Sequence, residues 1–153
     1  MATLNVTIKE EISIYGNTIQ KEMTHVISGV EKVKSEIKDV TPAGIGHDTI
    51  ISFNATGTGI SFKDDPKYLR ITNLAAAGSD NSTTITLSFF KEQEMSSFKL
   101  HNGQSFYLFN NDMYAETWGA TGAWSNSISL DNIDYITAGY TGTAAPVEIF
   151  SAI

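Results

Sequence analysis

The histidines are the first residues to consider for chemistry, because an imidazole binds metals and exchanges a proton near neutral pH. His25, His47 and His101 lie far apart in the chain, without the HxH or HExxH spacing that aims two ligands at one metal. There is no cysteine, which excludes disulfides, thiolate ligands and a cysteine nucleophile. No G-x-S-x-G or Walker pattern occurs. The sequence therefore predicts no catalytic residue, no metal site and no cofactor, and we expect a protein that is not an enzyme.

Acidic residues in three turns could supply oxygen ligands for calcium. These are Asp64-Asp65, Asp80-Asn81 and Asn110-Asn111-Asp112. None has the alternating oxygen ligands and closing glutamate of an EF-hand, so we interpret them as residues that cap turns. Glycoside hydrolysis needs two carboxylates that face one cleft, and sequence alone does not place such a pair.

The two tryptophans are the strongest candidates for binding. Trp118 and Trp124 lie in the stretch T-W-G-A-T-G-A-W. The surrounding segment, Asn110 to Ser129, has Asp112 and Glu116 as its only charges. Loop tryptophans anchor protein interfaces or stack on sugar rings, and they also close the edge of a core. We predict a partner interface with carbohydrate binding or core packing as the alternatives; its residues would be Trp118, Trp124, Asp112 and Glu116.

Charge is distributed unevenly along the chain. The formal net charge is −7, and no lysine or arginine follows Lys99. Nucleic acids and anionic membranes need clustered basic residues, so we expect neither as a partner. The N-terminus, M-A-T-L-N-V-T-I-K-E-E, alternates polar and apolar residues, unlike a signal peptide or a transmembrane helix. The length of 153 residues suits one domain, and we expect residues 1–153 to form a single β-sandwich domain.

Two long strands are expected at the N-terminus. Apolar residues at nearly every second position from Leu4 to Ile14 predict a half-buried strand, with a kink where Glu10 interrupts the apolar face. Thr18 to Ser28 is expected to return as a second strand after a short turn. Val30 to Val40 fits both a helical face and an amphipathic strand, and its strand-rich surroundings favour the strand.

A β-hairpin is expected at Ser97 to Phe109, because Asn-Gly between alternating apolar residues is a strong hairpin signal. A three-residue loop would place Phe98 opposite Phe106, both buried, with Gly103 in the left-handed conformation. The next segment, Asn110 to Ser129, is expected as a long loop. Further strands are predicted at Thr49 to Phe53, Tyr68 to Asn73, Thr83 to Phe90, Ile133 to Thr137 and Pro146 to Ser151. About ten strands, with at most one short helix near 30–40, predict an all-β fold: an antiparallel β-sandwich or a jelly-roll-like barrel.

Four stretches carry a family resemblance. They are Y-L-R-I-T-N-L at Tyr68 to Leu74, L-H-N-G-Q-S-F-Y-L, the C-terminal I-D-Y-I-T-A-G-Y-T-G-T-A-A-P-V-E-I-F-S-A and, in style, the opening M-A-T-L-N-V-T-I-K-E. In these stretches the chain resembles small virion structural proteins of tailed bacteriophages, marine ones especially. The resemblance implies a β-rich structural protein present in many copies on the particle, and it carries over no catalytic residue.

The resemblance also implies where the protein works and what it contacts. We expect a head decoration (cement) protein of the virion that stabilises the capsid through protein–protein contacts. Its partners would be the major capsid protein or other virion proteins, and it would form a homo-oligomer on the particle. The alternatives are a tail component, such as a tail-tip, fibre or adaptor subunit, and a carbohydrate- or receptor-binding module that uses Trp118 and Trp124.

Overall fold

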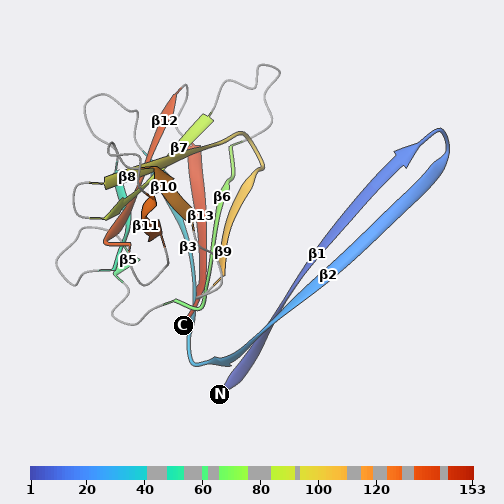
Figure 1. Cartoon of the computed structure of the whole chain (residues 1–153), viewed down its shortest axis with the longest axis horizontal. Coiled ribbons are helices and arrows are strands. Elements are labelled where there is room, and N and C mark those ends of the chain that lie inside the picture. The colour runs from blue at the N-terminus through green and yellow to red at the C-terminus, as the bar shows by residue number, and fades with distance from the viewer. Residues whose placement is uncertain are drawn as a thin grey trace.

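The chain folds into two packed layers of β-sheet, from which a long N-terminal hairpin projects (Figure 1). The computed structural model describes residues 1–40, 48–53, 60–61, 66–75, 84–91, 94–109, 115–118, 124–128, 133–141 and 145–153. Within these ranges there is no helix, so the all-β prediction is confirmed. The two layers are open sheets, which makes the fold a β-sandwich and not a closed barrel.

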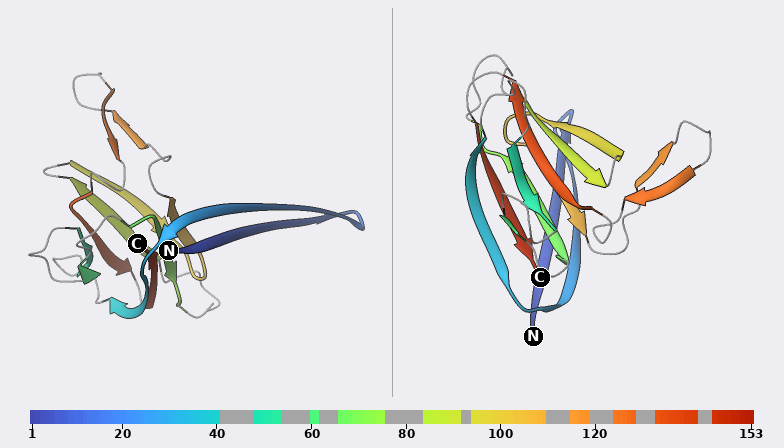
Figure 2. Two further views of the ribbon diagram at one scale, coloured as in Figure 1. Left: turned by 90° about the horizontal axis from the view of Figure 1, so that it is seen from below. Right: turned by 90° about the vertical axis from the view of Figure 1, so that its left-hand side faces the viewer.

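One layer has five strands, and the other has four. The first runs in the order β5 (Ile60–Ser61), β4 (Asp48–Ser52), β12 (Tyr135–Thr141), β7 (Thr84–Lys91) and β8 (Glu94–Leu100). The second runs in the order β3 (Val33–Val40), β13 (Ala145–Ala152), β6 (Tyr68–Asn73) and β9 (Ser105–Phe109). Separate two-stranded sheets are formed by β1 (Ala2–Ile14) with β2 (Asn17–Val30) and by β10 (Ala115–Trp118) with β11 (Trp124–Ile128) (Figure 2). Neighbouring strands are antiparallel except for a short parallel contact between β4 and β5.

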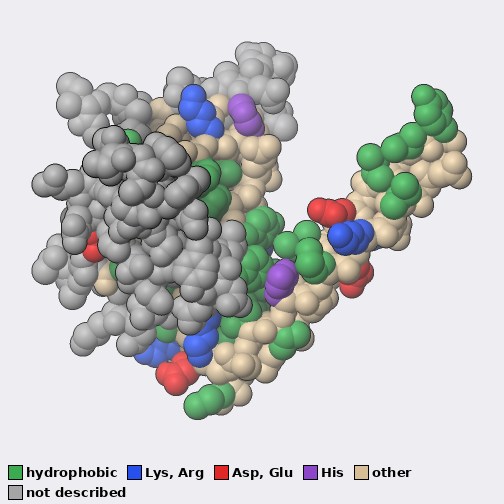
Figure 3. Space-filling view, viewed as in Figure 1, with side chains coloured by type: hydrophobic (Ala, Val, Ile, Leu, Met, Phe, Trp, Pro, Cys, Tyr) green, Lys and Arg blue, Asp and Glu red, His purple; other side chains and the backbone are tan. Residues whose placement is uncertain are grey.

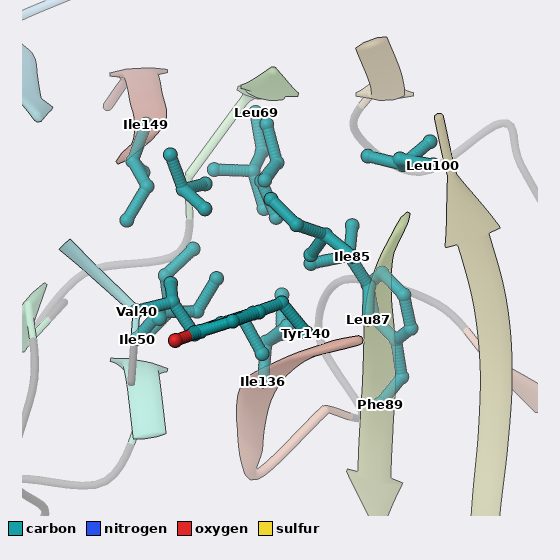
Figure 4. Close-up of a cluster of buried hydrophobic side chains, with 14 of the residues drawn as sticks. Val40, Ile50, Leu69, Ile85, Leu87, Phe89, Leu100, Ile136, Tyr140 and Ile149 are labelled. Carbon is teal, nitrogen blue, oxygen red and sulfur yellow. The ribbon is translucent and has the colours of Figure 1, made fainter. Parts of the chain in front are cut away.

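Side chains that alternate along the strands of both layers make the core (Figure 4). In β13, Val147 and Ile149 are buried, whereas Glu148 and Phe150, which alternate with them, are only partly covered. Full burial of a side chain of this size stabilises the fold by roughly 1.5–3 kcal/mol. Because β13 lies between β3 and β6 and supplies core residues, the expected C-terminal strand is an integral part of the sandwich.

The segment at 30–40 forms no helix: Val30 ends β2 and Val33–Val40 form β3. Apolar side chains of β3 lie on the face turned away from the core. Val40 is buried, and Lys38 on the same face donates a hydrogen bond to the carbonyl oxygen of Thr49 at 3.0 Å. On the opposite face, Val33 and Ile37 are 53% and 65% exposed. The outer surface of the four-stranded sheet therefore carries apolar side chains at its β3 edge.

The hairpin expected at Ser97 to Phe109 was a wrong prediction. β8 pairs with β7 and β9 pairs with β6, so the two strands belong to opposite layers. The turn between them has the expected conformation, with a φ of 72° at Gly103. The rings of Phe98 and Phe106 do approach each other, with centroids 5.0 Å apart, but across the sandwich and with Phe98 still 41% exposed.

Asn73 holds the chain where it crosses between the layers. Its side chain is fully buried, donates to the carbonyl oxygen of Leu100 at 3.1 Å and accepts from the N–H of Ala75 at 3.0 Å. Its backbone carbonyl accepts from Gly103 N–H at 2.9 Å, and its backbone N–H donates to the carbonyl of Gln104 at 3.0 Å. One residue of β6 thus binds both sides of the turn that joins β8 to β9.

The sequence predicted one long loop from Asn110 to Ser129, and this prediction was wrong. The segment contains β10 and β11, which pair antiparallel with a register shift next to Trp118. Turn-forming residues between two short β-rich runs are compatible with a hairpin. The many glycines and polar residues of this segment favoured the prediction of a loop instead.

The arm, residues 2–30, consists of β1 and β2. Its strands pair in regular register through Glu10 and Lys21, so the kink expected at Glu10 does not occur. The irregularity lies instead at the root, where the register shifts between Ala2 and Leu4 and Gly29 adopts a φ of 71°. Every β1 residue from Lys9 to Ile14 is exposed, so the expected half-buried strand is buried only near its root.

Hydrogen bonds tie the root of the arm to the sandwich. The N–H groups of Glu31 and Lys32 both donate to the carbonyl oxygen of Ile153, and the Ile153 N–H donates back to Lys32 at 2.9 Å. The Lys67 ammonium donates to the carbonyl of Gly29. The direction in which the arm leaves the sandwich is therefore set by the end of β13 and the start of β6.

Replacing Asn73 with alanine is expected to lower the free energy of unfolding by about 1–3 kcal/mol, because the Leu100 carbonyl and the Ala75 N–H lose buried partners. Denaturant titration with a fluorescence or circular-dichroism readout measures this. Asn5→Ala, on the exposed part of the arm, is the control and should change the value by less than about 0.5 kcal/mol. Equal effects of the two changes would contradict the role given to Asn73.

Candidate protein-docking site

The described residues bring no set of metal-ligating side chains together. Among them, no cluster of three or more histidine, aspartate or glutamate side chains could hold a metal ion. His25 packs against Phe109, with ring centroids 4.6 Å apart. His101 stands at the exposed turn after β8, and His47 lies outside the described residues.

The residues predicted to form a partner interface are only partly placed. Asp112 lies outside the described residues. Glu116 and Trp118 lie in β10 and Trp124 in β11, with Trp118 and Trp124 as register partners across the hairpin. The backbone thus brings the two tryptophan positions together, and their role in binding stays a prediction.

A shallow hollow of about 300 Å³ lies on the five-stranded sheet. It is lined by Thr49, Ser88, Phe90, Met95, Tyr135 and Thr137. The rings of Phe90 and Tyr135 stack on each other, 4.6 Å apart and 13° from parallel. These residues offer hydroxyl groups and apolar surface, but no carboxylate, imidazole or amine for acid–base chemistry.

The arm has one apolar and one polar face, because residues opposite each other in an antiparallel pair point to the same side. The apolar face carries the register pairs Leu4–Ile27, Val6–His25, Ile8–Met23, Glu10–Lys21, Ile12–Ile19 and Ile14–Asn17. The polar face carries Thr7 and Thr24, whose hydroxyls lie 3.0 Å apart, and Glu11, which accepts a hydrogen bond from Gln20 at 2.6 Å. The arm is therefore two-sided along its whole length.

The root of the apolar face packs on the sandwich. Leu4, Val6 and Ile27 contact a small cluster on the four-stranded sheet. That cluster consists of Val30, Tyr68 and Ala152, with Phe109 and Phe150 packed beside it. A second hydrophobic core therefore forms between the arm and the outside of the sheet.

Beyond this root the same face is left without cover. We call this part the distal face of the arm; it consists of Glu10, Ile12, Ile14, Ile19, Lys21 and Met23. Its four apolar side chains are 46–61% exposed. Figure 3 shows apolar side chains gathered along the far half of the arm. Exposed apolar side chains gathered on one face in this way make the distal face a candidate site of interaction.

The tip of the arm ends on a fully exposed tyrosine. Tyr15 and Gly16 have φ values of 51° and 83° and form the two-residue turn between Ile14 and Asn17. Such turns favour Asn-Gly, and an aromatic residue at positive φ is strained. Asparagine would fit position 15 with less strain, so the tyrosine at this turn is not explained by the stability of the hairpin.

Sequence reasoning missed this site, although a signal for it was present. The period-two pattern was recognised, but it was interpreted as one half-buried face of the sandwich. The two strands, of 13 and 14 residues, are much longer than the usual five or six. Strands of that length, joined by a two-residue turn, extend well beyond a small sandwich.

The distal face should contribute little to the stability of the isolated chain. Ile12→Thr together with Ile19→Thr keeps β-branched side chains in the strands and should change the free energy of unfolding by less than about 0.5 kcal/mol. Leu4→Thr with Ile27→Thr, at the packed root, should cost about 1–2 kcal/mol. Denaturant titration of both variants is the measurement, and a costly distal change would mean that this face is covered within the monomer.

The packed root also predicts a pH effect. Burial raises the pKa of the Tyr68 hydroxyl above its usual value, against an opposing effect of Arg70 and with a smaller contribution from Tyr107. The neutral form is favoured in the folded state, so the stabilisation is complete below about pH 10, where the unfolded tyrosine ionises. It is lost as the pH rises through the folded pKa. Tyr68→Phe should therefore flatten the fall in unfolding free energy above about pH 10, and an unchanged slope would contradict burial of the hydroxyl.

Comparisons with protein-family models, with curated proteins and with solved structures found no match to this chain. The described part of the chain also contains no helix long and apolar enough to cross a membrane. Function is therefore inferred from the arm, from the sheet beneath its root and from the contacts between them.

Proposed function

We propose that this chain is a structural protein of a tailed-phage virion, a capsid decoration protein that holds to the particle by protein–protein contacts. The observation that carries the proposal is the distal face of the arm. It presents four exposed apolar side chains on a paired hairpin outside the sandwich. The sequence stretches that resemble phage virion proteins are the reason for proposing a phage particle as the partner of this surface.

The arm is suited to bridging neighbouring subunits. Thirteen residues of extended strand span about 43 Å, so the tip reaches well beyond the sandwich that anchors it. The hairpin gathers its apolar side chains on one face, so that face can bind a partner through side-chain contacts. Apolar anchors in such contacts supply most of the binding energy, and a decoration protein needs no chemistry beyond this.

The tryptophan hairpin is proposed as a second contact with the particle. Its two tryptophan positions are opposite each other in β10 and β11, and aromatic side chains are frequent anchors of interfaces. Asp112 and Glu116 would mainly steer the encounter with a neutral or basic protein surface.

The test is the occupancy of this protein on purified particles of the phage that encodes it. Quantitative mass spectrometry should find the chain in a fixed, high ratio to the major capsid protein, and particle reconstruction should place it on the head. Ile12→Thr with Ile19→Thr should lower occupancy about tenfold or more, since two apolar anchors are lost.

The matched control is Glu11→Thr with Gln20→Thr, which changes the neighbouring register pair on the polar face and should leave occupancy unchanged. Trp124→Ala tests the second contact in the same assay. Absence of the chain from purified particles would overturn the proposal. A position on the tail would favour the tail-component alternative instead.

A further inference from the structure

We infer that the distal face of the arm docks on the outside of the four-stranded sheet of a second copy of this chain. The inference rests on the docking role proposed for the arm, and it names the partner of that site. We call the receiving surface the outer sheet face; it consists of Ile37, Arg70, Tyr107, Glu148 and Phe150. Each copy would offer one arm and one outer sheet face.

The outer sheet face combines apolar side chains with the Arg70–Glu148 ion pair, and the chain's own arm leaves it partly open. The register places Phe150 beside Arg70 and Arg70 beside Tyr107, with Ile37 beside Glu148. Ile37 is 65% and Tyr107 37% exposed, and Phe150 is partly exposed. Figure 3 shows apolar side chains on the side of the sandwich that faces the arm.

The chain already shows that the two surfaces fit each other chemically. The arm's own root packs Leu4, Val6 and Ile27 against a cluster that contains Tyr68 and Ala152 at one end of this sheet. His25 of the arm also packs on the ring of Phe109. The distal face continues the apolar side of the same hairpin, and the outer sheet face continues the same side of the same sheet. Docking between copies would therefore extend an apolar contact that exists within one copy.

Each of the two surfaces carries one acidic and one basic side chain next to each other. On the distal face, Glu10 and Lys21 are register partners between apolar pairs. On the outer sheet face, Arg70 and Glu148 form an ion pair at 2.7 Å, with the guanidinium also over the Phe150 ring at 5.4 Å. Glu10 can approach Arg70 while Lys21 approaches Glu148, so each charge meets an opposite one as the apolar side chains pack.

The chain's own arm cannot cover this surface with its distal face. The root is fixed by the hydrogen bonds to Ile153, and from there the paired strands run away from the sandwich, as Figure 1 and the left view of Figure 2 show. The dimensions suit a second copy: residues 9–14 span about 20 Å, and β13 spans about 26 Å. One arm and one receiving face per copy permit a two-fold dimer in which both contacts form.

The first experiment is analytical ultracentrifugation of the full chain over a range of concentrations. The wild type should self-associate, and Ile12→Thr with Ile19→Thr should weaken association about tenfold or more. Glu11→Thr with Gln20→Thr, on the polar face, should leave it unchanged. A wild-type chain that stays monomeric throughout would overturn the inference.

The second experiment locates the contact by disulfide cross-linking, which is clean because the chain has no cysteine of its own. A copy carrying Ile12→Cys is mixed with a copy carrying Ile37→Cys, so any mixed disulfide joins two chains. This pair should cross-link readily, whereas Gln20→Cys with Ile37→Cys should not, because Gln20 points to the other side of the arm. Equal cross-linking of both pairs would overturn the assignment of the faces.

The outcomes separate this inference from the proposed function. A chain that is monomeric and does not cross-link, yet needs Ile12 and Ile19 to occupy the particle, would overturn docking between copies and leave the virion role standing. Arm-dependent binding to phosphatidylcholine–phosphatidylglycerol vesicles without self-association would replace the second copy with a lipid surface. Cross-linking as expected in a chain absent from particles would support the contact and overturn the virion role.

Discussion

The four-stranded sheet carries apolar side chains on both of its faces, and the rest of the structure follows from the need to cover them. The inner face, with Val147 and Ile149 of β13, is covered by the five-stranded sheet. The outer face, with Tyr68 and Phe109, is covered by the root of the arm. A sheet with one solvated face alternates apolar and polar residues, and the ring residues on the outside break that pattern where the arm lies.

The same constraint explains why the arm projects. Its apolar face has to begin over the sheet, but the strands are straight paired ribbons whose root is bent by the Gly29 bulge and bound to Ile153. A bulge bends a strand and strengthens its local twist. Once the hairpin has passed the edge of the sheet, its apolar side packs on no other part of the chain that the structure describes. The distal face is thus a consequence of strand length combined with a fixed exit direction.

The sequence predicted strands well because alternation is a local property. Tyr68 to Asn73 was predicted with its observed bounds, and Pro146 to Ser151 lies within β13. The partner of a strand is not local: alternation in Ser97 to Phe109 looks the same whether the next strand joins the same sheet or the opposite one. Asn73 of β6 stabilises the crossing to the opposite sheet, because it hydrogen-bonds to Leu100 and Gln104. No spacing pattern in the sequence predicts such a contact. For the same reason the candidate site was missed, since the period-two pattern of β1 shows that one face is apolar but not what covers it.

The N-terminal part of the chain, which includes the arm, differs in net charge from the remainder. Residues 1–40, which form the arm and β3, contain six acidic and five basic residues, whereas residues 41–153 contain eleven and five. Most of the negative charge therefore lies outside the arm and the β3 edge. Like charge opposes close approach, but at physiological salt it is screened beyond about 8 Å. An arm of about 43 Å reaches much farther than that distance. A nearly neutral, apolar-faced arm therefore meets less like-charge repulsion on approaching a neighbour than the acidic remainder of the chain would.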